Sequence, residues 1–110
     1  MLLPQATVTG SADTVRARLD ELADRGVVGF KAFMCPSGIS DFPMVDERTL
    51  AGGMARAAVL GLPVAVHAED PAVTEPRAVQ ARAEGRSGVR DYLASRPVQA
   101  EVAAIRTAVA

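Results

Sequence analysis

The chain has 110 residues, and its 12 basic and 13 acidic side chains give a formal net charge of -1. This balance argues against nucleic-acid or membrane-surface binding, which calls for a clearly basic face, and no apolar run approaches the roughly 20 residues that span a bilayer. One cysteine, Cys35, allows no internal disulfide, so a reducing cytoplasm is expected. A chain of this length makes one small domain or part of a larger one.

The first element with a clear pattern is an amphipathic helix over residues 11–25. Ser11 suits the N-cap position, and Gly26 provides a C-terminal stop. Apolar residues recur between them at helical spacing: Val15, Leu19 and Leu22. Residues 27–34 follow, apolar except for Lys31, which is the pattern of a strand buried on both faces of a parallel sheet.

The middle of the chain predicts a loop, a second helix and a second strand. The turn residues of 35–45 indicate a loop. Asp46 can cap the next helix, which Gly61 ends, and the expected apolar stripe is Leu50, Met54, Ala57 and Ala58. Residues 62–68 then form a second strand of the buried type.

The pattern loosens over residues 69–95, although 73–84 can be helical. A last helix is expected from Pro97, with an apolar face made of Val98, Val102, Ile105 and Val109. Strands joined by helical crossovers imply a parallel α/β sheet. With only two confident strands, and a last helix that reaches the end of the chain without a cap, the sequence is expected to be part of a larger fold.

Two residues can carry chemistry, because Lys31 is the only lysine and His67 the only histidine. Each lies toward the end of a predicted strand, and successive parallel strands are usually neighbours. A lysine there can be structural, with its amine reaching solvent, and a histidine can be a satisfied core residue. The functional alternatives are a Schiff base with a carbonyl substrate, or a lysine carbamate that bridges two metal ions with histidines completing the shells.

The neighbours of these two residues have simpler interpretations. Glu69 and Asp70 are interpreted as solvated loop charges or helix caps. Cys35 could be a ligand or a nucleophile, but a small apolar residue at a strand end is favoured. Ser37 and Gly38 could present backbone groups to a substrate; an ordinary turn is the simpler interpretation, and the sequence does not decide between the two. The arginines are spread along the chain and indicate a solvated surface.

Three blocks of the sequence resemble allantoinases, which are cyclic amidohydrolases like dihydroorotases and hydantoinases. Residues 26–38 (GVVGFKAFMCPSG) resemble the lysine-bearing strand, and 62–71 (LPVAVHAEDP) the next metal-ligand strand. The third block, 84–106, contains the Ser-Arg-Pro sequence of 95–97 that favours allantoinase over its relatives. The likeness covers 11–110, whereas 1–10 is an atypical start. It implies a partial TIM-type (β/α)8 barrel of two to three β/α units, since a whole barrel takes about 250 residues.

The resemblance also implies a metal centre and a reaction. It makes Lys31 the carbamylated lysine that bridges two divalent metal ions, usually zinc, and His67 a ligand of one of them. The complete enzyme would open the ring of a cyclic ureide, allantoin to allantoate, in purine breakdown, and would commonly be a tetramer. The family's His-x-His pair, a further histidine and the catalytic aspartate are not in this chain, so no catalytic residue is assigned here.

Two other hypotheses stay open beside a piece of a working hydrolase. One is a catalytically inactive, truncated remnant. The other is a lysine Schiff-base lyase, which borohydride trapping at Lys31 would support, although it explains neither His67 nor the Ser-Arg-Pro block. On any of these interpretations, two or three strands leave open sheet edges. The isolated chain is therefore expected to be poorly stable and to bind a catalytic metal weakly.

Overall fold

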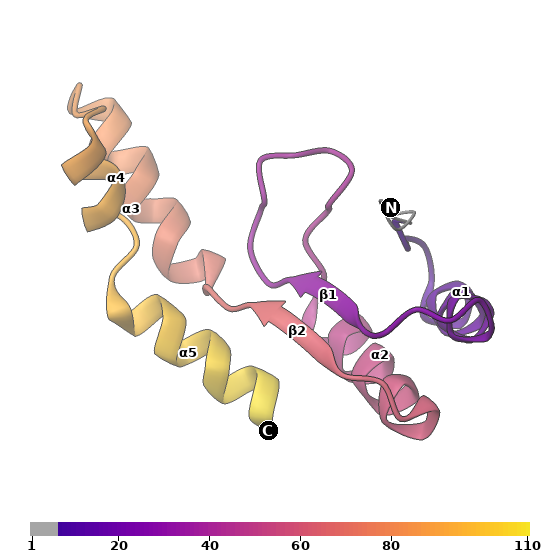
Figure 1. Ribbon diagram of the computed structural model, residues 1–110. Coiled ribbons are helices and arrows are strands. Elements are labelled where there is room, and N and C mark those ends of the chain that lie inside the picture. The colour runs from indigo at the N-terminus through magenta and orange to yellow at the C-terminus, as the bar shows by residue number, and fades with distance from the viewer. Residues whose placement is uncertain (1–6) are drawn as a thin grey trace.

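The computed structural model describes residues 7–110, so most of the atypical start at 1–10 lies outside the described residues. Within this range five helices and two strands follow in the order α1, β1, α2, β2, α3, α4, α5 (Figure 1). The molecule is elongated, with extents of 49 × 34 × 23 Å. Helices α1 and α2 lie at one end, α3, α4 and α5 at the other, and the strands lie between them (Figure 1). None of the helices in this range is long and apolar enough to cross a membrane.

Helix α1 (Ala12–Asp24) confirms the first prediction. The Ser11 hydroxyl accepts a hydrogen bond from the Thr14 backbone N–H at 3.3 Å and so caps the helix. The apolar residues Leu19 and Leu22 are buried, as their spacing predicts. Helix α1 packs along α2.

Helix α2 (Glu47–Leu60) begins and ends at its predicted caps. Asp46 accepts a hydrogen bond from the Thr49 N–H at 2.7 Å. Gly61 takes a φ of 69°, in the left-handed region that glycine enters without Cβ strain. Leu50 and Ala57 are buried and Met54 is half-buried, as predicted. Ala58 is exposed, so its place in the predicted apolar stripe is wrong.

The strands β1 (Phe30–Phe33) and β2 (Val64–His67) form a parallel pair, with α2 as the crossover between them. Phe30 pairs with Val64 and Phe33 with His67. Both strands are shorter than predicted. Pro63 has no N–H to donate to the ladder, and it joins the sheet only through its carbonyl, which accepts from the Phe30 N–H at 3.0 Å.

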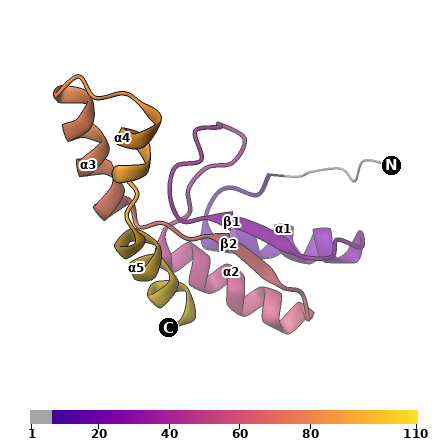
Figure 2. The same ribbon diagram turned by 60° about the vertical axis from the view of Figure 1, so that its left-hand side comes forward.

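The two faces of this sheet differ. One face carries Phe30, Ala32, Val64 and Val66, all half-buried, and helix α2 lies beneath the strands (Figure 2). The other face carries Lys31, Ala65 and His67, which are exposed, and Phe33, which is half-buried. The prediction of strands buried on both faces is therefore wrong for this chain, because helices cover only one side of the two strands.

The C-terminal third consists of α3 (Pro71–Ala83), α4 (Val89–Ala94) and α5 (Val98–Val109). The helix expected at 73–84 is confirmed, two residues longer at its start. Helix α4 was not predicted, since six residues between turn signals carry too little periodicity to stand out.

Helix α5 follows Pro97 as predicted, but the other side of the helix is buried. Ala100 and Ala104 are 1% and 2% exposed, whereas the expected apolar face is exposed over all four of its residues: Val98, Val102, Ile105 and Val109. The buried side faces the link between β2 and α3, where the Ala100 carbonyl accepts from the Asp70 N–H at 3.0 Å. The larger face has no partner among the described residues.

Candidate functional site

Lys31 and His67 lie on the same open face of the sheet, on neighbouring strands. The sequence-based expectation that the two strands are adjacent is confirmed. Lys31 pairs with Ala65, however, while His67 pairs with Phe33, so the two candidate residues are offset by two positions. Lys31 is exposed rather than buried in the sheet, and its Nζ lies 5.3 Å from the centre of the Phe33 ring.

Phe33 lies between the two candidates and contacts both. Its ring and the imidazole of His67 are stacked, with centroids 5.7 Å apart and an angle of 22° between the planes. Across the loop, Phe42 is tilted against the same ring at 6.0 Å. The Val45 N–H also donates to the Phe33 carbonyl at 2.9 Å, so the loop that leaves β1 returns to its end. The aromatic ring thus forms one wall beside the histidine.

Glu69 connects His67 to the far end of the molecule. Its Oε1 lies 2.7 Å from Nε2 of His67, and its Oε2 accepts a hydrogen bond from Nη1 of Arg96, also at 2.7 Å. The Glu69 side chain is only 19% exposed. Burial pushes the pKa of this carboxyl upward, but the hydrogen bonds from His67 and Arg96 outweigh it and hold the pKa below its usual range. The interpretation of Glu69 as a solvated loop charge is therefore wrong, because it is held as a carboxylate between two donors.

Asp70, the next residue, behaves as the sequence predicts. Its carboxylate accepts from the Ala72 N–H at 2.9 Å and caps helix α3, which begins at Pro71. The cap fixes the direction in which the chain leaves β2. Glu69 is thereby placed in the short link between a strand end and a helix start, where its carboxylate can turn back toward His67.

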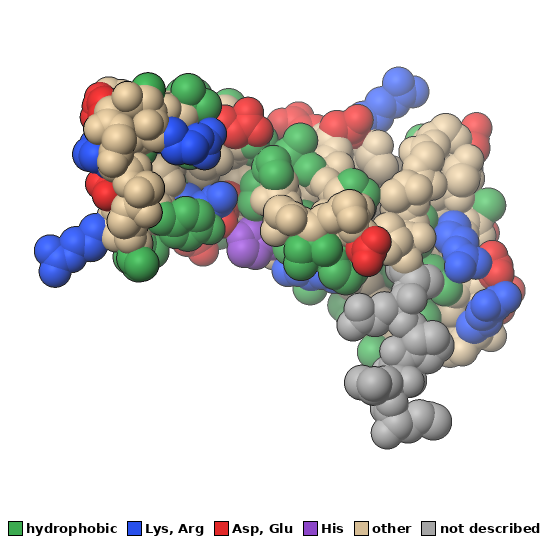
Figure 3. Space-filling view, turned by 90° about the horizontal axis from the view of Figure 1, so that it is seen from above, with side chains coloured by type: hydrophobic (Ala, Val, Ile, Leu, Met, Phe, Trp, Pro, Cys, Tyr) green, Lys and Arg blue, Asp and Glu red, His purple; other side chains and the backbone are tan. Residues whose placement is uncertain are grey.

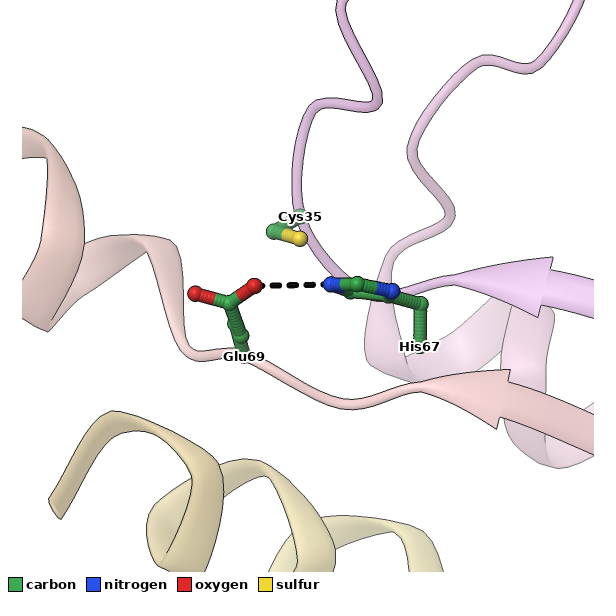
Figure 4. A group of neighbouring side chains, drawn as sticks. All are labelled: Cys35, His67 and Glu69. Atoms are coloured by element: carbon green, nitrogen blue, oxygen red, sulfur yellow. Dashed lines mark hydrogen bonds and ion pairs between the residues drawn. The ribbon is translucent and has the colours of Figure 1, made fainter. Parts of the chain in front are cut away.

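Cys35 completes a group of three side chains at the end of the strands (Figure 4). It is 2% exposed, and one ligand atom each from Cys35, His67 and Glu69 all lie within 4.8 Å of one another. Burial, and secondarily the carboxylate of Glu69, raises the pKa of the Cys35 thiol, against the opposing effect of Arg96. The prediction of a small buried residue at a strand end is confirmed. The buried thiol is held protonated, which disfavours it as a nucleophile.

Ser37 and Gly38 serve the fold of their own loop. The Ser37 hydroxyl lies 2.7 Å from the Phe42 carbonyl and 3.1 Å from the Ile39 carbonyl, and it accepts from the Ile39 N–H at 3.1 Å. Gly38 has a φ of 79°, which an L residue rarely adopts. Both residues thus have a structural explanation, and their part in substrate binding stays a prediction.

The site is open to solvent. Its histidine surface is visible between the α3–α4 end of the molecule and the loop that follows β1 (Figure 3). The His67 side chain is 47% exposed, in contrast to Glu69 and Arg96 at 19% and 27%. Glu69 and Arg96 were missed as site residues. The available signal was the His-x-Glu spacing next to a strand end, since a carboxylate two residues after the histidine can reach back to its ring.

Comparison with known proteins relates this stretch to one group of enzymes. No family model matches the chain. Curated relatives are the allantoinases of Solibacter usitatus and Rubrobacter xylanophilus, 54% and 53% identical over 92 residues, which are 84% of this chain. The allantoinase of Escherichia coli is 42% identical over 93 residues. Each match covers 20% of the relative, so the chain spans about a fifth of the length of the curated relatives it matches.

Solved structures give the same relation at the level of the fold. The L-hydantoinase (dihydropyrimidinase) of Arthrobacter aurescens superposes with a TM-score of 0.81 at 30% identity, over 86% of this chain and 21% of that one. The dihydropyrimidinase of Brevibacillus agri gives a TM-score of 0.82 at 32% identity, over 94% and 22%. The chain is thus homologous to one stretch of the allantoinases, and its β/α units superpose on one stretch of the hydantoinase and dihydropyrimidinase structures.

Proposed function

We propose that this stretch supplies the two central metal-binding strands of a complete cyclic amidohydrolase. The observation that carries the proposal is the placement of Lys31 and His67 on one open face, at neighbouring parallel strands. In (β/α)8 barrels the active site is built at the carboxyl ends of the strands. The identity with allantoinases favours allantoin, opened to allantoate, as the substrate and product.

The side chains present fit a divalent metal centre. Imidazole is a ligand that zinc prefers. The neutral Nζ of Lys31 can form a bond to the carbon of CO₂ and release a proton, and the resulting carbamate offers two oxygen ligands. In the structure this Nζ has no ion pair among the described residues and lies 5.3 Å from the centre of the Phe33 ring. Two divalent metal ions bound there, zinc by the resemblance, would polarise the amide carbonyl and bring the pKa of a water close to neutrality.

The other residues of the site shape it and hold the ligands in place. Phe33 limits the rotation of the His67 ring by stacking on it. Cys35, which is 2% exposed, fills the space beside the strand ends. The acid–base step of the reaction belongs to an aspartate that the resemblance places outside this chain, so the chain contributes metal ligands and not the proton donor.

The complete enzyme has properties that follow from the same resemblance. It is proposed to be a cytoplasmic homotetramer that takes a small cyclic ureide as its substrate. A formal net charge of only -1, with no basic stripe in the sequence, suits a small-molecule substrate. Light scattering of the purified complete enzyme checks the tetramer.

Sequencing the DNA on both sides of this reading frame tests the proposal. We expect the frame to continue, with a His-x-His upstream and a histidine and an aspartate downstream. Stop codons or frameshifts on both sides would contradict the proposal. The chain would then be a remnant that lacks most of the metal ligands, and ureide hydrolysis would not be its activity.

A further inference from the structure

His67, Glu69 and Arg96 form a chain of charge-assisted hydrogen bonds that runs from the strand end into the junction of α4 and α5. The two oxygens of Glu69 are divided between its neighbours: Oε1 faces His67 Nε2 and Oε2 faces Arg96 Nη1, both at 2.7 Å. Arg96 is 27 residues from Glu69 in the sequence, so this contact is made by the tertiary fold. Arg96 thus holds the carboxylate of Glu69 in place through the oxygen that does not face His67.

An ionised carboxylate has no proton and can only accept hydrogen bonds. The Nε2 atom of His67 must therefore carry the proton in this contact. When the ring is neutral, the other nitrogen, Nδ1, then has a free lone pair. Figure 4 shows Nε2 directed to Glu69 and the second ring nitrogen on the opposite side. Among the described residues Nδ1 has no hydrogen-bond partner.

We propose that Glu69 and Arg96 are positioning residues that hold His67 in its Nε2–H tautomer and so reserve Nδ1 as the metal-ligating atom. This inference rests on the proposed function of His67 as a ligand. Histidine ligands commonly donate their other ring N–H to a carboxylate, and loss of that partner typically weakens metal affinity by about 10–100-fold. Arg96 acts through Glu69, and its own guanidinium is held over the Tyr92 ring at 4.8 Å.

The proposal gives a role to Ser-Arg-Pro, the block on which the resemblance depends. Ser95 is buried, and its hydroxyl donates to the Tyr92 carbonyl at 2.6 Å, which closes helix α4. Pro97 is the N-cap of α5. Arg96 lies between these two helix ends, so its backbone is fixed by the helix boundary on each side. A short rigid junction is what a residue needs if it is to hold a carboxylate at a distant strand end.

The single histidine makes a direct test possible. Nitrogen-15 NMR of the untagged 110-residue chain shows one imidazole, whose two ring nitrogens report the tautomer. The spectrum is recorded at about pH 8.5, well above the ordinary histidine pKa of about 6.5, at low temperature with sucrose to favour the folded state. We expect an Nε2–H tautomer and an observable ring N–H proton, because the hydrogen bond slows its exchange with water.

Matched variants separate positioning from general stability. Glu69→Ala is expected to lose the ring N–H signal and to move the tautomer ratio toward that of a histidine in an unfolded peptide, and Arg96→Gln to do so in part. Glu84→Gln is the control, because Glu84 accepts from Arg86 at 2.7 Å in an equally charged but exposed pair remote from His67. It is expected to leave the imidazole signals unchanged. The comparison uses samples in which circular dichroism shows that the helices are formed, and in these a tautomer ratio in the unmodified chain equal to that of Glu69→Ala would overturn the proposal.

Metal addition distinguishes the proposal from direct ligation by the three clustered side chains. With Zn²⁺ bound through Nδ1, the Nε2–H signal persists, and Glu69→Ala weakens zinc binding by about 10–100-fold. Ligation by Cys35, His67 Nε2 and Glu69 would instead remove that proton and give a sulfur-to-metal charge-transfer band with Co²⁺, absent in Cys35→Ser. That result would overturn the proposal. These measurements use no substrate, so they can be interpreted even if the complete enzyme does not hydrolyse a ureide.

Discussion

Lys31 and His67 lie on the same face of adjacent parallel strands, but not opposite each other, since Phe33 takes the place across from the histidine. The Phe33 ring stacks on the imidazole of His67. The centre of the same ring lies 5.3 Å from Nζ of Lys31, which is two residues earlier on β1. This arrangement keeps the two polar groups apart without a direct hydrogen bond. A separated pair of this kind leaves room for a bridging group, such as the proposed metal centre.

The close approach of the two strands depends on Gly29. A Cβ at this position would lie 3.0 Å from the backbone carbonyl oxygen of Pro63, which is tighter than nine in ten real Cβ contacts, so the neighbouring strand would have to shift. Gly29→Ala is therefore expected to push β1 from β2 and to lower the thermal midpoint of the chain. Gly52→Ala is the matched control, because its Cβ meets nothing within 4 Å and alanine is a better helix former by about 1 kcal/mol. Equal midpoints for the two variants in circular dichroism would contradict this role of Gly29.

An ion pair links the first two helices and gives the chain a pH dependence. Arg56 Nε and Nη2 donate to the two oxygens of Asp20 at 2.6 and 2.8 Å, and this hydrogen bonding, opposed by desolvation, lowers the pKa of Asp20. A carboxyl with a lowered pKa in the folded state stabilises it above the unfolded pKa of about 3.9, and that stabilisation is lost as pH falls through the folded pKa.

Asp20→Asn is therefore expected to lower the unfolding midpoint at neutral pH, and the difference from the unmodified chain should vanish in acid. Asp24→Asn, on the same helix and without an ion pair among the described residues, serves as control. Urea unfolding at a series of pH values from neutral to acid measures both. A difference for Asp20→Asn that persists unchanged at the lowest pH would exclude this ion pair as its cause.

The exposed face of α5 predicts how the isolated chain behaves. Val102 and Ile105 are 39% and 43% exposed beside the more exposed Val98 and Val109, which makes an apolar stripe with no described partner. We expect the 110-residue chain to self-associate and to unfold over a broad transition. Replacing Val102 and Ile105 with glutamate should reduce the association, measured by light scattering, without loss of helical circular dichroism. A monomer that unfolds cooperatively before any substitution would refute the expectation.

The elements with strong local signals were predictable. Caps at Ser11 and Asp46 and the glycine at 61 fixed the ends of the first two helices to within a residue or so. Side-chain burial was harder, because hydrophobicity reports what a surface can bury and not whether a partner is present. The strands and α5 therefore have the predicted apolar patterns but expose a face. Helix α4 was missed because six residues give little more than one helical turn and a half.

The residues of the candidate site also differed in how well the sequence predicted them. Lys31 and His67 stood out because each is the only residue of its type. Glu69 did not stand out, since acidic residues after a strand are common and their partners come from elsewhere. Its partner Arg96 reaches it across 27 residues of sequence, through a contact that only the folded chain creates. Local sequence carries no direct signal for such a contact.

We propose that Lys31 and His67 are metal ligands of an allantoin hydrolase. A hybrid enzyme tests this directly. In the Solibacter usitatus allantoinase, the matching stretch, which is 54% identical over 92 residues, is replaced by the sequence of this chain, and the rest of that allantoinase supplies the rest of the barrel. We expect the hybrid to bind metal and to hydrolyse allantoin. Lys31→Ala and His67→Ala should each lower bound metal and reduce the rate by at least 100-fold, while Glu84→Gln changes neither. A folded hybrid that hydrolyses allantoin equally well without Lys31 or His67 would contradict the account.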